Sequence, residues 1–274
     1  MIKKKRILIL GGSGSIGSEI VKQLAPGNKI YVVDINESGL FDLVDALKGE
    51  NWVYGRVGDI RDYKTVRDVF EDFKPQIVIN AAALKHVELM EYTPLEAIQT
   101  NVIGHYNVVH IAKTWECVEK LIFISTDKVV SSNSIMGATK RLSEIITKNM
   151  GYTIVRFGNV MGSRGSLMNI WQRQHNEGKP LTVTHENMSR YMMTIPDAVK
   201  LVLKAIEDTK GGEIFIMKMG KKHNIFELAQ QITKSTLQDI VITGMRPGET
   251  LTEELMFEEE KARATEEENF YIIK

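Results

Sequence analysis

The chain has 274 residues, 43% of them hydrophobic and 26% charged, a composition typical of a globular protein with a sizeable core. Its 35 basic and 35 acidic side chains cancel to a formal net charge of zero, which argues against a nucleic-acid partner and against binding to a membrane surface. The single cysteine, Cys117, excludes an internal disulfide and a cysteine-based metal cluster, and we expect no metal site.

Basic residues precede a short apolar run at the N-terminus, MIKKKRILIL. Only Ile7 to Leu10 are apolar before a glycine cluster, fewer than the roughly 7–15 residues of a secretory signal. No run approaches the roughly 18 apolar residues that would span a bilayer. We therefore expect a cytoplasmic protein with no membrane partner.

The first strand is expected over Ile7 to Leu10, and GGSGSIGSEIVKQLA follows it, turning helical after the glycines. Glycines allow a backbone to approach a pyrophosphate, and the amino end of a helix adds free N–H groups and the positive end of its dipole. A glycine triplet alone is a weak signal, but the strand-loop-helix context predicts a dinucleotide site. The residues expected to contact the dinucleotide here are Gly11, Ser13, Gly14, Ser15, Ile16 and Gly17.

The second strand, Ile30 to Asp34, ends in a carboxylate. That group can accept hydrogen bonds from the adenosine ribose and would repel a 2′-phosphate, which favours NAD over NADP. The alternative is that Asp34 caps a helix. A third strand within NWVYGRVGDI brings Asp59 and Ile60 to the next strand end, where adenine would lie in a doubly wound sheet.

A helix is expected over Tyr63 to Phe73 and a strand over Ile77 to Ala83. The small side chains of Ala81 and Ala82 would leave room for the backbone to pass close to the cofactor. A helical pattern follows, in which we expect Asn101 to be a buried bridge to the site.

Lys85 and His86 stand at the mouth of that helical segment, beside the expected cofactor. A basic group at the carboxyl edge of a sheet suits a phosphorylated substrate, so both residues are candidates for substrate binding. For His86 the alternative is a packed or capping side chain.

The stretch STDKVVSSNSIMGATK follows the apolar run Leu121 to Ile124. Thr126, Asp127 and Lys128 offer a hydroxyl, a carboxylic acid and an amine where a buried strand should end, which is where open α/β sheets hold their chemistry. Lys140 lies further on, in the helix that follows. The alternative is an ordinary polar loop between strand and helix.

Strands and helices alternate up to a strand over Thr153 to Phe157, which predicts a doubly wound parallel sheet of Rossmann type with right-handed crossovers. We expect residues 1–157 to form an NAD-binding domain, joined by helices and a strand that return from later sequence. Residues 158–274 would form mainly a smaller C-terminal lobe that binds the substrate. The final stretch, FEEEKARATEEENFYIIK, is expected to be a solvated acidic helix or loop followed by a short strand.

Three arginines of the C-terminal lobe stand next to glycine, proline or serine rather than within a helical pattern. They are candidates for binding a diphosphate, and the alternative is that each is an exposed surface arginine. These residues are Arg164, Arg190 and Arg246.

Together these residues resemble the extended short-chain dehydrogenases/reductases that act on nucleotide sugars. More narrowly, the chain resembles the UDP-N-acetylglucosamine 4,6-dehydratases of surface-polysaccharide and protein-glycan biosynthesis. The motifs that match cover nearly the whole chain in the order of the family, and they are GGSGSIG, VGDIRD, NAAALKHVELMEYTPLEAIQTNVIG, STDK, MGATKR, RFGNVMGSRGS, NMSRYMMT and RPGE.

The resemblance implies that a bound nicotinamide takes hydride from C4 of UDP-N-acetylglucosamine and later returns it to C6. In between, a base removes the C5 proton while an acid protonates the departing 6-hydroxyl. Asp127 would be the acid and Lys128 the base. A lysine in this role needs its pKa lowered by burial or by a nearby cation.

One motif departs from the wider superfamily, which uses Y-x-x-x-K. Here Met136 stands four residues before Lys140, and a thioether has no proton to exchange. If Lys140 holds the nicotinamide ribose, removal of the C4 hydroxyl proton falls to Thr126, Asp127 or a water. The departure counts against ordinary dehydrogenase or 4-epimerase activity.

The resemblance also implies a set of contacts to the UDP portion, in which arginines pair with phosphates and a carboxylate accepts hydrogen bonds from the uridine ribose. The residues that the family pattern assigns to this portion are Asn159, Arg164, Arg190, Arg246 and Glu249.

The sequence Asp34-Ile35-Asn36 is similar to relatives that retain the configuration at C5, which implies UDP-2-acetamido-2,6-dideoxy-α-D-xylo-hex-4-ulose as the product. The alternatives are an inverting dehydratase/5-epimerase and a binding module that kept the dinucleotide site and lost catalysis. Extended members usually associate through helices, so we expect a homo-oligomer.

Overall fold

The computed structural model of the protein describes residues 2–50, 52–130, 133–236 and 238–274. Its centre is a β-sheet formed by β1 (Arg6–Leu10), β2 (Lys29–Asp34), β3 (Val53–Val57), β4 (Ile77–Asn80), β5 (Lys120–Thr126), β6 (Thr153–Phe157), β11 (Ile214–Met217), β14 (Ala264–Glu266) and β15 (Phe270–Ile273). The four apolar residues of β1 are fully buried, as expected for a parallel strand covered on both faces.

The strands lie in the order β14-β15-β11-β6-β5-β4-β1-β2-β3. Neighbours from β3 to β11 are parallel, while β15 and β14 close one edge in antiparallel pairing. The strand order reverses between β1 and β4, which makes the carboxyl ends of these strands the expected ligand-binding crevice. The predicted doubly wound parallel sheet is confirmed. We expected one strand to return from later sequence, whereas β11, β14 and β15 all do.

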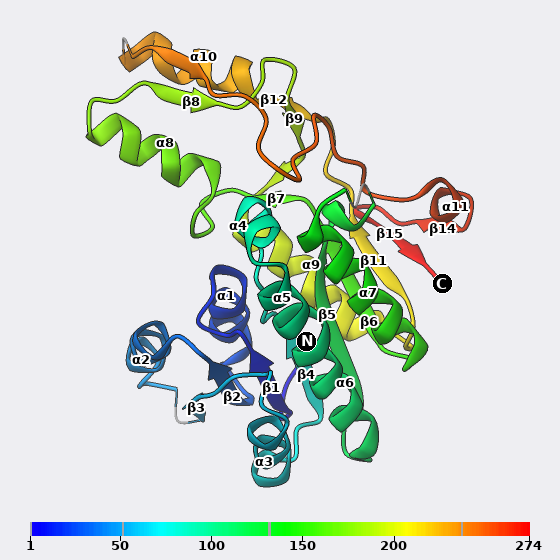
Figure 1. The fold of residues 1–274 in the computed structure, drawn as a ribbon. Helices are drawn as coiled ribbons and strands as arrows, with labels where there is room; N and C mark the ends of the chain where they lie inside the picture. The colour runs from blue at the N-terminus through cyan, green and yellow to red at the C-terminus, as the bar shows by residue number, and fades with distance from the viewer. Residues whose placement is uncertain (1, 51, 131–132, 237) are drawn as a thin grey trace.

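Helices cover both faces of this sheet, with α6 and α7 in front of it and α9 behind it in Figure 1. Within these layers α1 packs beside α9, and α6 packs beside both α3 and α7. The helices and helical turns of this part of the chain are α1 (Ser15–Leu24), α2 (Glu37–Ala46), α3 (Tyr63–Phe73), α4 (Val87–Tyr92), α5 (Pro94–Ala97), the π-helical η1 (Ile98–Gly104), α6 (His105–Thr114), the short 3₁₀ turn η2 (Asp127–Val129), α7 (Ile135–Asn149) and α9 (Ile195–Asp208). Among the described residues, none of the helices is both long enough and apolar enough to cross a bilayer.

A smaller lobe projects beyond the carboxyl edge of the sheet, where α8, β8 and α10 stand apart from the central layers (Figure 1). It has its own apolar cluster, built from Trp171, Leu181, Val183, Met188, Ile225 and Ala229. The remaining elements, most of which belong to this lobe, are β7 (Asn159–Val160), α8 (Leu167–Asn176), β8 (Leu181–Val183), β9 (Ser189–Arg190), β10 (Met192–Met193), β12 (His223–Asn224), α10 (Ile225–Thr236), β13 (Ile240–Ile242) and α11 (Glu258–Lys261).

The predicted bounds of α3 and β6 are confirmed, but β4 ends at Asn80 rather than at Ala83. The Asn80 side chain accepts a hydrogen bond from Ala82 N at 3.1 Å and joins His105 Nδ1 at 2.9 Å. A side chain that bonds its own backbone two residues on favours a turn, so it leads the chain out of the sheet.

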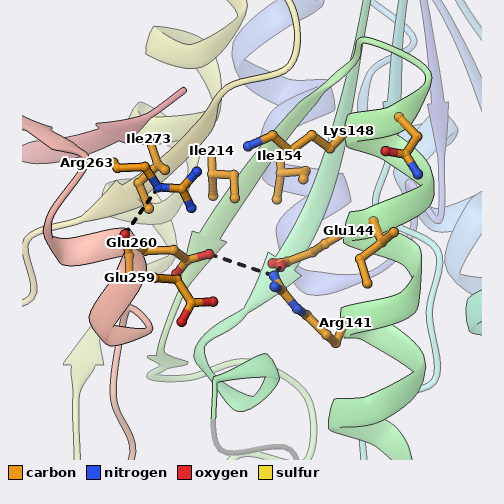
Figure 2. Close-up of a pocket in the computed structure, with 11 residues that line it drawn as sticks. Arg141, Glu144, Lys148, Ile154, Ile214, Glu259, Glu260, Arg263 and Ile273 are labelled. Atoms are coloured by element: carbon orange, nitrogen blue, oxygen red, sulfur yellow. Dashed lines mark hydrogen bonds and ion pairs between the residues drawn. The ribbon is translucent and has the colours of Figure 1, made fainter.

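Arg156 on β6 is fully buried and joins two helices to the sheet. Its guanidinium donates to Glu144 of α7 at 2.7 and 3.0 Å and to Glu260 of α11 at 2.7 and 3.1 Å. Both acids also line a cavity of about 190 Å³, and Figure 2 shows them there on α7 and α11 with Arg141. The expectation of a wholly solvated acidic end was wrong for Glu260, because this carboxylate is buried against Arg156.

Replacing Arg156 with methionine should lower the free energy of unfolding by about 3–5 kcal/mol, because two buried carboxylates would lose their counter-charge. Urea unfolding measures the loss. The matched control is Arg263→Met, an exposed arginine near the same cavity, which should change stability by no more than about 0.5 kcal/mol. Equal, small effects of the two substitutions would contradict this role of Arg156.

Candidate functional site

Lys128 is the centre of a polar cluster at the carboxyl end of β5. Its Nζ lies 3.1 Å from Asp127 Oδ1, 2.8 Å from Asn159 Oδ1 and 3.0 Å from Glu253 Oε1. Arg190 contacts the same Glu253 oxygen, with its Nε 3.3 Å away. We call these five residues the Lys128 cluster. It joins η2, β7, β9 and the segment that precedes α11.

The Asp127 carboxyl group is completely covered, with an exposed fraction of 0%. Its Oδ1 accepts hydrogen bonds from Thr126 Oγ1 at 3.0 Å and from Lys128 Nζ at 3.1 Å. Its Oδ2 is buried and has no hydrogen-bond partner among the described residues. Thr126 and Lys128 are both partly exposed, so they are the groups through which a proton can enter or leave Asp127.

Glu253 is a member of the cluster that the sequence did not predict. It is 3% exposed, and its Oε2 accepts from Asn159 Nδ2 at 3.4 Å. It follows the predicted Glu249 by four residues in RPGETLTEE, next to another acid, Glu254, that pairs instead with Lys222 at the surface. Nothing in the local pattern separates these acids, because only the tertiary fold brings Glu253 to Lys128.

The Arg190 guanidinium bonds the protein itself as well as Glu253. It donates to the carbonyl oxygens of Ser189 at 2.8 Å, Thr250 at 2.7 Å and Leu251 at 3.1 Å. These bonds hold the segment that carries Glu253. They also show that Arg190, predicted as a diphosphate ligand, is largely committed to internal partners in this state.

Burial shifts the proton affinities within the cluster. It raises the pKa of Asp127 to about 6, with the charge of Glu253 adding to the effect and the ammonium of Lys128 opposing it. Burial alone would lower the pKa of Lys128, but the carboxylates of Asp127 and Glu253 outweigh it and raise that pKa above its ordinary value. The expected lowering of the Lys128 pKa was therefore wrong for this state, because two acids, and not a cation, dominate its surroundings.

Lys140 and Met136 lie on α7, the helix that follows η2. Lys140 Nζ donates to Ile124 O at 2.5 Å and lies 4.0 Å from the centre of the Phe123 ring, and burial lowers the pKa of this lysine to about 7. Met136 is buried in a small apolar cluster of α4, α5 and α7. Its thioether therefore packs where the wider superfamily has a reactive phenol.

Asn101 is buried in η1 and bridges two parts of the site, as predicted. Its Oδ1 accepts from Leu84 N at 2.8 Å, and its Nδ2 donates to Leu84 O at 3.0 Å and to Thr139 Oγ1 at 3.2 Å. The amide thus ties the loop after β4 to the helix that carries Lys140.

The glycine loop after β1 has the form of a dinucleotide cradle. Gly11 has a φ of 73°, and a Cβ placed on it would lie 2.5 Å from Ala82 N, while one on Gly17 would lie 2.3 Å from Gly11 O. Helix α1 begins at Ser15 without a side-chain cap, which leaves its amino end available to an anion. The residues present therefore fit the pyrophosphate of NAD.

Asp34 anchors the same loop at the end of β2. Its carboxylate accepts from Ser13 N at 2.8 Å and from Asn36 N at 2.9 Å. The cap of α2 is Asn36, so the helix-cap alternative for Asp34 was wrong. After β3, where adenine was expected, Asp59 pairs with Arg61 at 2.6 Å and Ile60 is buried in the core.

Predicted substrate residues meet over the glycine loop. Arg164 N donates to Ser15 Oγ at 3.0 Å, and Lys85 Nζ donates to Arg164 O at 2.7 Å. The His86 ring lies against Gly165. Partial burial lowers the pKa of both Lys85 and His86, aided by the charge of Lys128 for the first and of Lys85 for the second.

Arg246 and Glu249 form a separate pair beside α4. The Arg246 backbone N–H donates to Glu249 Oε2 at 3.1 Å, and its exposed guanidinium lies 3.6 Å from Glu88. These two predicted UDP ligands are thus together, while Asn159 and Arg190 belong to the Lys128 cluster.

Sequence relatives span most of the chain. It is 44% identical to a Methanocaldococcus jannaschii protein named as an uncharacterized membrane protein, over 99% of this chain and 86% of that one. It is 35% identical to the inverting UDP-N-acetylglucosamine 4,6-dehydratase of Campylobacter jejuni serotype O:2 and 34% identical to the UDP-glucose 4-epimerase of Rickettsia bellii, each over 100% of this chain and 84% of the relative. Two longer polysaccharide-biosynthesis relatives, from Staphylococcus aureus and Bacillus subtilis, are spanned over only 45% of their length.

Solved structures share the fold. The X-ray structure of Pen from Bacillus thuringiensis has a TM-score of 0.94 and 34% sequence identity, over 99% of this chain and 89% of that one. DesIV of Streptomyces venezuelae, a dTDP-glucose 4,6-dehydratase solved with NAD and TYD bound, has a TM-score of 0.82 at 21% identity, over 94% and 90%. The latter likeness concerns the fold alone.

The family model described as "Polysaccharide biosynthesis protein" matches residues 7–274, from the first strand to the end of the last. That range includes the glycine loop, the Lys128 cluster and the C-terminal lobe. The chain therefore belongs to the polysaccharide biosynthesis protein family, within the extended short-chain dehydrogenases/reductases.

Proposed function

We propose that the protein is an NAD-dependent UDP-N-acetylglucosamine 4,6-dehydratase. The observation that carries this proposal is the pairing of Asp127 with Lys128 at 3.1 Å, at the carboxyl end of β5 and beside a dinucleotide cradle. Elimination of water needs an acid and a base over one sugar ring, and this pair offers both. The name of the Campylobacter jejuni relative supports the same reaction.

The cofactor site follows from the residues already described. The glycine loop and the amino end of α1 would hold the pyrophosphate, Asp34 the adenosine ribose and Lys140 the nicotinamide ribose. Bound NAD would supply the hydride acceptor for C4 and the hydride donor for C6. A carboxylate at Asp34 favours NAD over NADP, because it repels a 2′-phosphate.

Thr126 and Asp127 would carry the protons of the two hydroxyl groups. Because the Asp127 carboxyl is covered, Thr126 Oγ1 is its outlet, through the 3.0 Å hydrogen bond. The proton leaving the C4 hydroxyl passes through the partly exposed Thr126 hydroxyl to solvent, and Asp127, once protonated by Lys128, donates through the same hydroxyl to the departing 6-oxygen. Met136 need not take part, because Thr126 takes the place of the phenol in removing the C4 hydroxyl proton.

Lys128 would act on the C5 proton as a neutral amine. In the ligand-free state its ammonium is stabilised by two carboxylates, so it must shed one proton before it acts. The amine then removes the C5 proton and, in the retaining outcome, returns it on the same face. Lys128 is then a neutral amine, and uptake of one proton from solvent, equal to the one released from C4, restores its ammonium.

We favour retention at C5, because Lys128 is one base on one side of the ring and Asp34-Ile35-Asn36 matches the retaining pattern. Inversion is the second candidate, favoured by the printed name of the Campylobacter jejuni relative. It would need a different group to protonate C5 from the opposite face.

Residues 158–274 would bind mainly the UDP portion. Arg164, Arg246 and Glu249 are the groups best placed for this role, since the first two are exposed and the third lies beside Arg246. Asn159 and Arg190 would have to exchange a bond within the Lys128 cluster to contact UDP.

The protein incubated with UDP-N-acetylglucosamine in deuterated water should give a product with a new C6 methyl group and deuterium at C5. Proton NMR follows both signals, and the C5 couplings distinguish the xylo from the arabino product. Unchanged substrate, even with NAD supplied, would overturn the dehydratase proposal for this sugar.

Lys128→Ala should lower kcat by about 10²–10⁴-fold, because the base at C5 is lost. Calorimetry should still detect binding of UDP-N-acetylglucosamine to this variant. The matched control is Lys221→Ala, an exposed lysine of the C-terminal lobe, which should leave kcat unchanged. Equal activity of the Lys128→Ala variant and the unmodified chain would remove Lys128 from the mechanism, and binding without turnover in the unmodified chain would favour a binding module.

Asp34→Asn should narrow the preference for NAD over NADP by about tenfold or more, because the repulsion of a 2′-phosphate is removed. Calorimetric titration of the cofactor-stripped protein with each dinucleotide gives the ratio of dissociation constants. The control is Asp42→Asn on α2, an exposed carboxylate of the same domain. A ratio that is the same in both variants and in the unmodified chain would refute the role of Asp34.

A further inference from the structure

Glu253 is a buried carboxylate to which the proposed reaction assigns no role. Its Oε1 lies 3.0 Å from Lys128 Nζ and 3.3 Å from Arg190 Nε, and its Oε2 accepts from Asn159 Nδ2 at 3.4 Å. A buried acid with this many partners is held in one place. The place is directly beside the amine that would remove the C5 proton.

The charges of the cluster balance only while Lys128 keeps its proton. Asp127 and Glu253 carry two negative charges, and Lys128 and Arg190 carry two positive charges. If Lys128 lost its proton to solvent, two buried carboxylates would face a single guanidinium. Transfer to Asp127 Oδ1, 3.1 Å away, instead leaves one carboxylate, Glu253, paired with Arg190.

We propose that Glu253 is a positioning residue of the reaction, which fixes Lys128 Nζ against Asp127 and whose charge keeps one proton shared between these two groups. The inference rests on the proposed function for its catalytic meaning. Within the cluster it predicts that the acid at Asp127 and the amine at Lys128 appear in one step, by a proton moving along an existing hydrogen bond.

Hydrogen bonds from two buried arginines hold the backbone on either side of Glu253. Arg190 binds the carbonyl oxygens of Thr250 and Leu251, and Arg156 Nη1 donates to Leu255 O at 3.1 Å. The segment is thus fastened on both sides of Glu253 by buried arginines. Such double anchoring keeps the carboxylate within hydrogen-bond reach of Lys128 and prevents it from turning to solvent.

Glu253→Gln keeps the shape of the side chain and removes its charge, so it tests the proposal. Loss of a nearby negative charge lowers the pKa of Lys128 and that of Asp127 together. We would titrate the ligand-free protein labelled with ¹³Cε-lysine and assign the Lys128 signal with Lys128→Ala. The Lys128 titration should move about 1–3 pH units lower in Glu253→Gln.

The pH dependence of kcat should move in the same direction. Activity requires the Asp127–Lys128 pair to hold one proton, so uptake of a second proton sets the acidic limb and loss of the shared proton sets the alkaline limb. Both limbs should therefore shift to lower pH in Glu253→Gln. The matched control is Glu254→Gln, which removes the neighbouring surface charge that pairs with Lys222 and should move neither the titration nor the profile.

The outcomes separate this inference from the proposed function. An unmoved Lys128 titration in a folded Glu253→Gln protein overturns it, even if kcat falls. A moved titration in a protein that does not turn over UDP-N-acetylglucosamine supports the role of Glu253 while the proposed function fails. If Glu253→Gln does not fold, Asn159→Asp decides, because a carboxylate added beside Nζ should move the titration to higher pH, and no movement would refute the proposal.

Discussion

The guanidinium of Arg156 is the constraint on which the site depends. It sits in the middle of β6 and binds carboxylates from α7 and α11, which are far apart in the sequence. Glu144, its partner on α7, also accepts from Ser125 Oγ at 2.7 Å, and Ser125 directly precedes Thr126 and Asp127. One buried cation therefore fixes both the strand end that leads to Asp127 and Lys128 and the late segment that carries Glu253.

A buried guanidinium is tolerable only because its donors are satisfied. Taking ions from water costs several kcal/mol each, and close hydrogen-bonded geometry must offset that cost. Arg156 meets the condition with two carboxylates and the carbonyl oxygen of Leu255. The Lys128 cluster follows the same principle with weaker margins, since its cation must be able to give up a proton. The Arg156 network therefore keeps its charges fixed, whereas in the proposed reaction the protonation of Lys128 in the nearby cluster changes.

Much of the fold could be predicted from the sequence, because apolar strands and amphipathic helices alternate with clear turns. The placement of Asp127 and Lys128 at the end of a buried strand could also be predicted, since the two residues are adjacent and follow an apolar run. Glu253 and Glu260 could not, because each lies in an acidic stretch and only contacts made across the fold distinguish it from its neighbours. The predicted direction of the Lys128 pKa shift was wrong because the adjacent Asp127 acts together with Glu253, a residue 125 positions later in the chain (253 − 128).

The antiparallel end of the sheet also has a consequence for how the molecule is made. Strands β1 to β6 can pair in the order of their synthesis, but Glu253 and the elements α11, β14 and β15 are translated after all of them. Until they arrive, Arg156 has Glu144 but lacks Glu260, and Lys128 lacks Glu253. A nascent chain can thus form most of its parallel sheet while the Lys128 cluster and the partners of Arg156 are still incomplete, and translation of the later segment completes both.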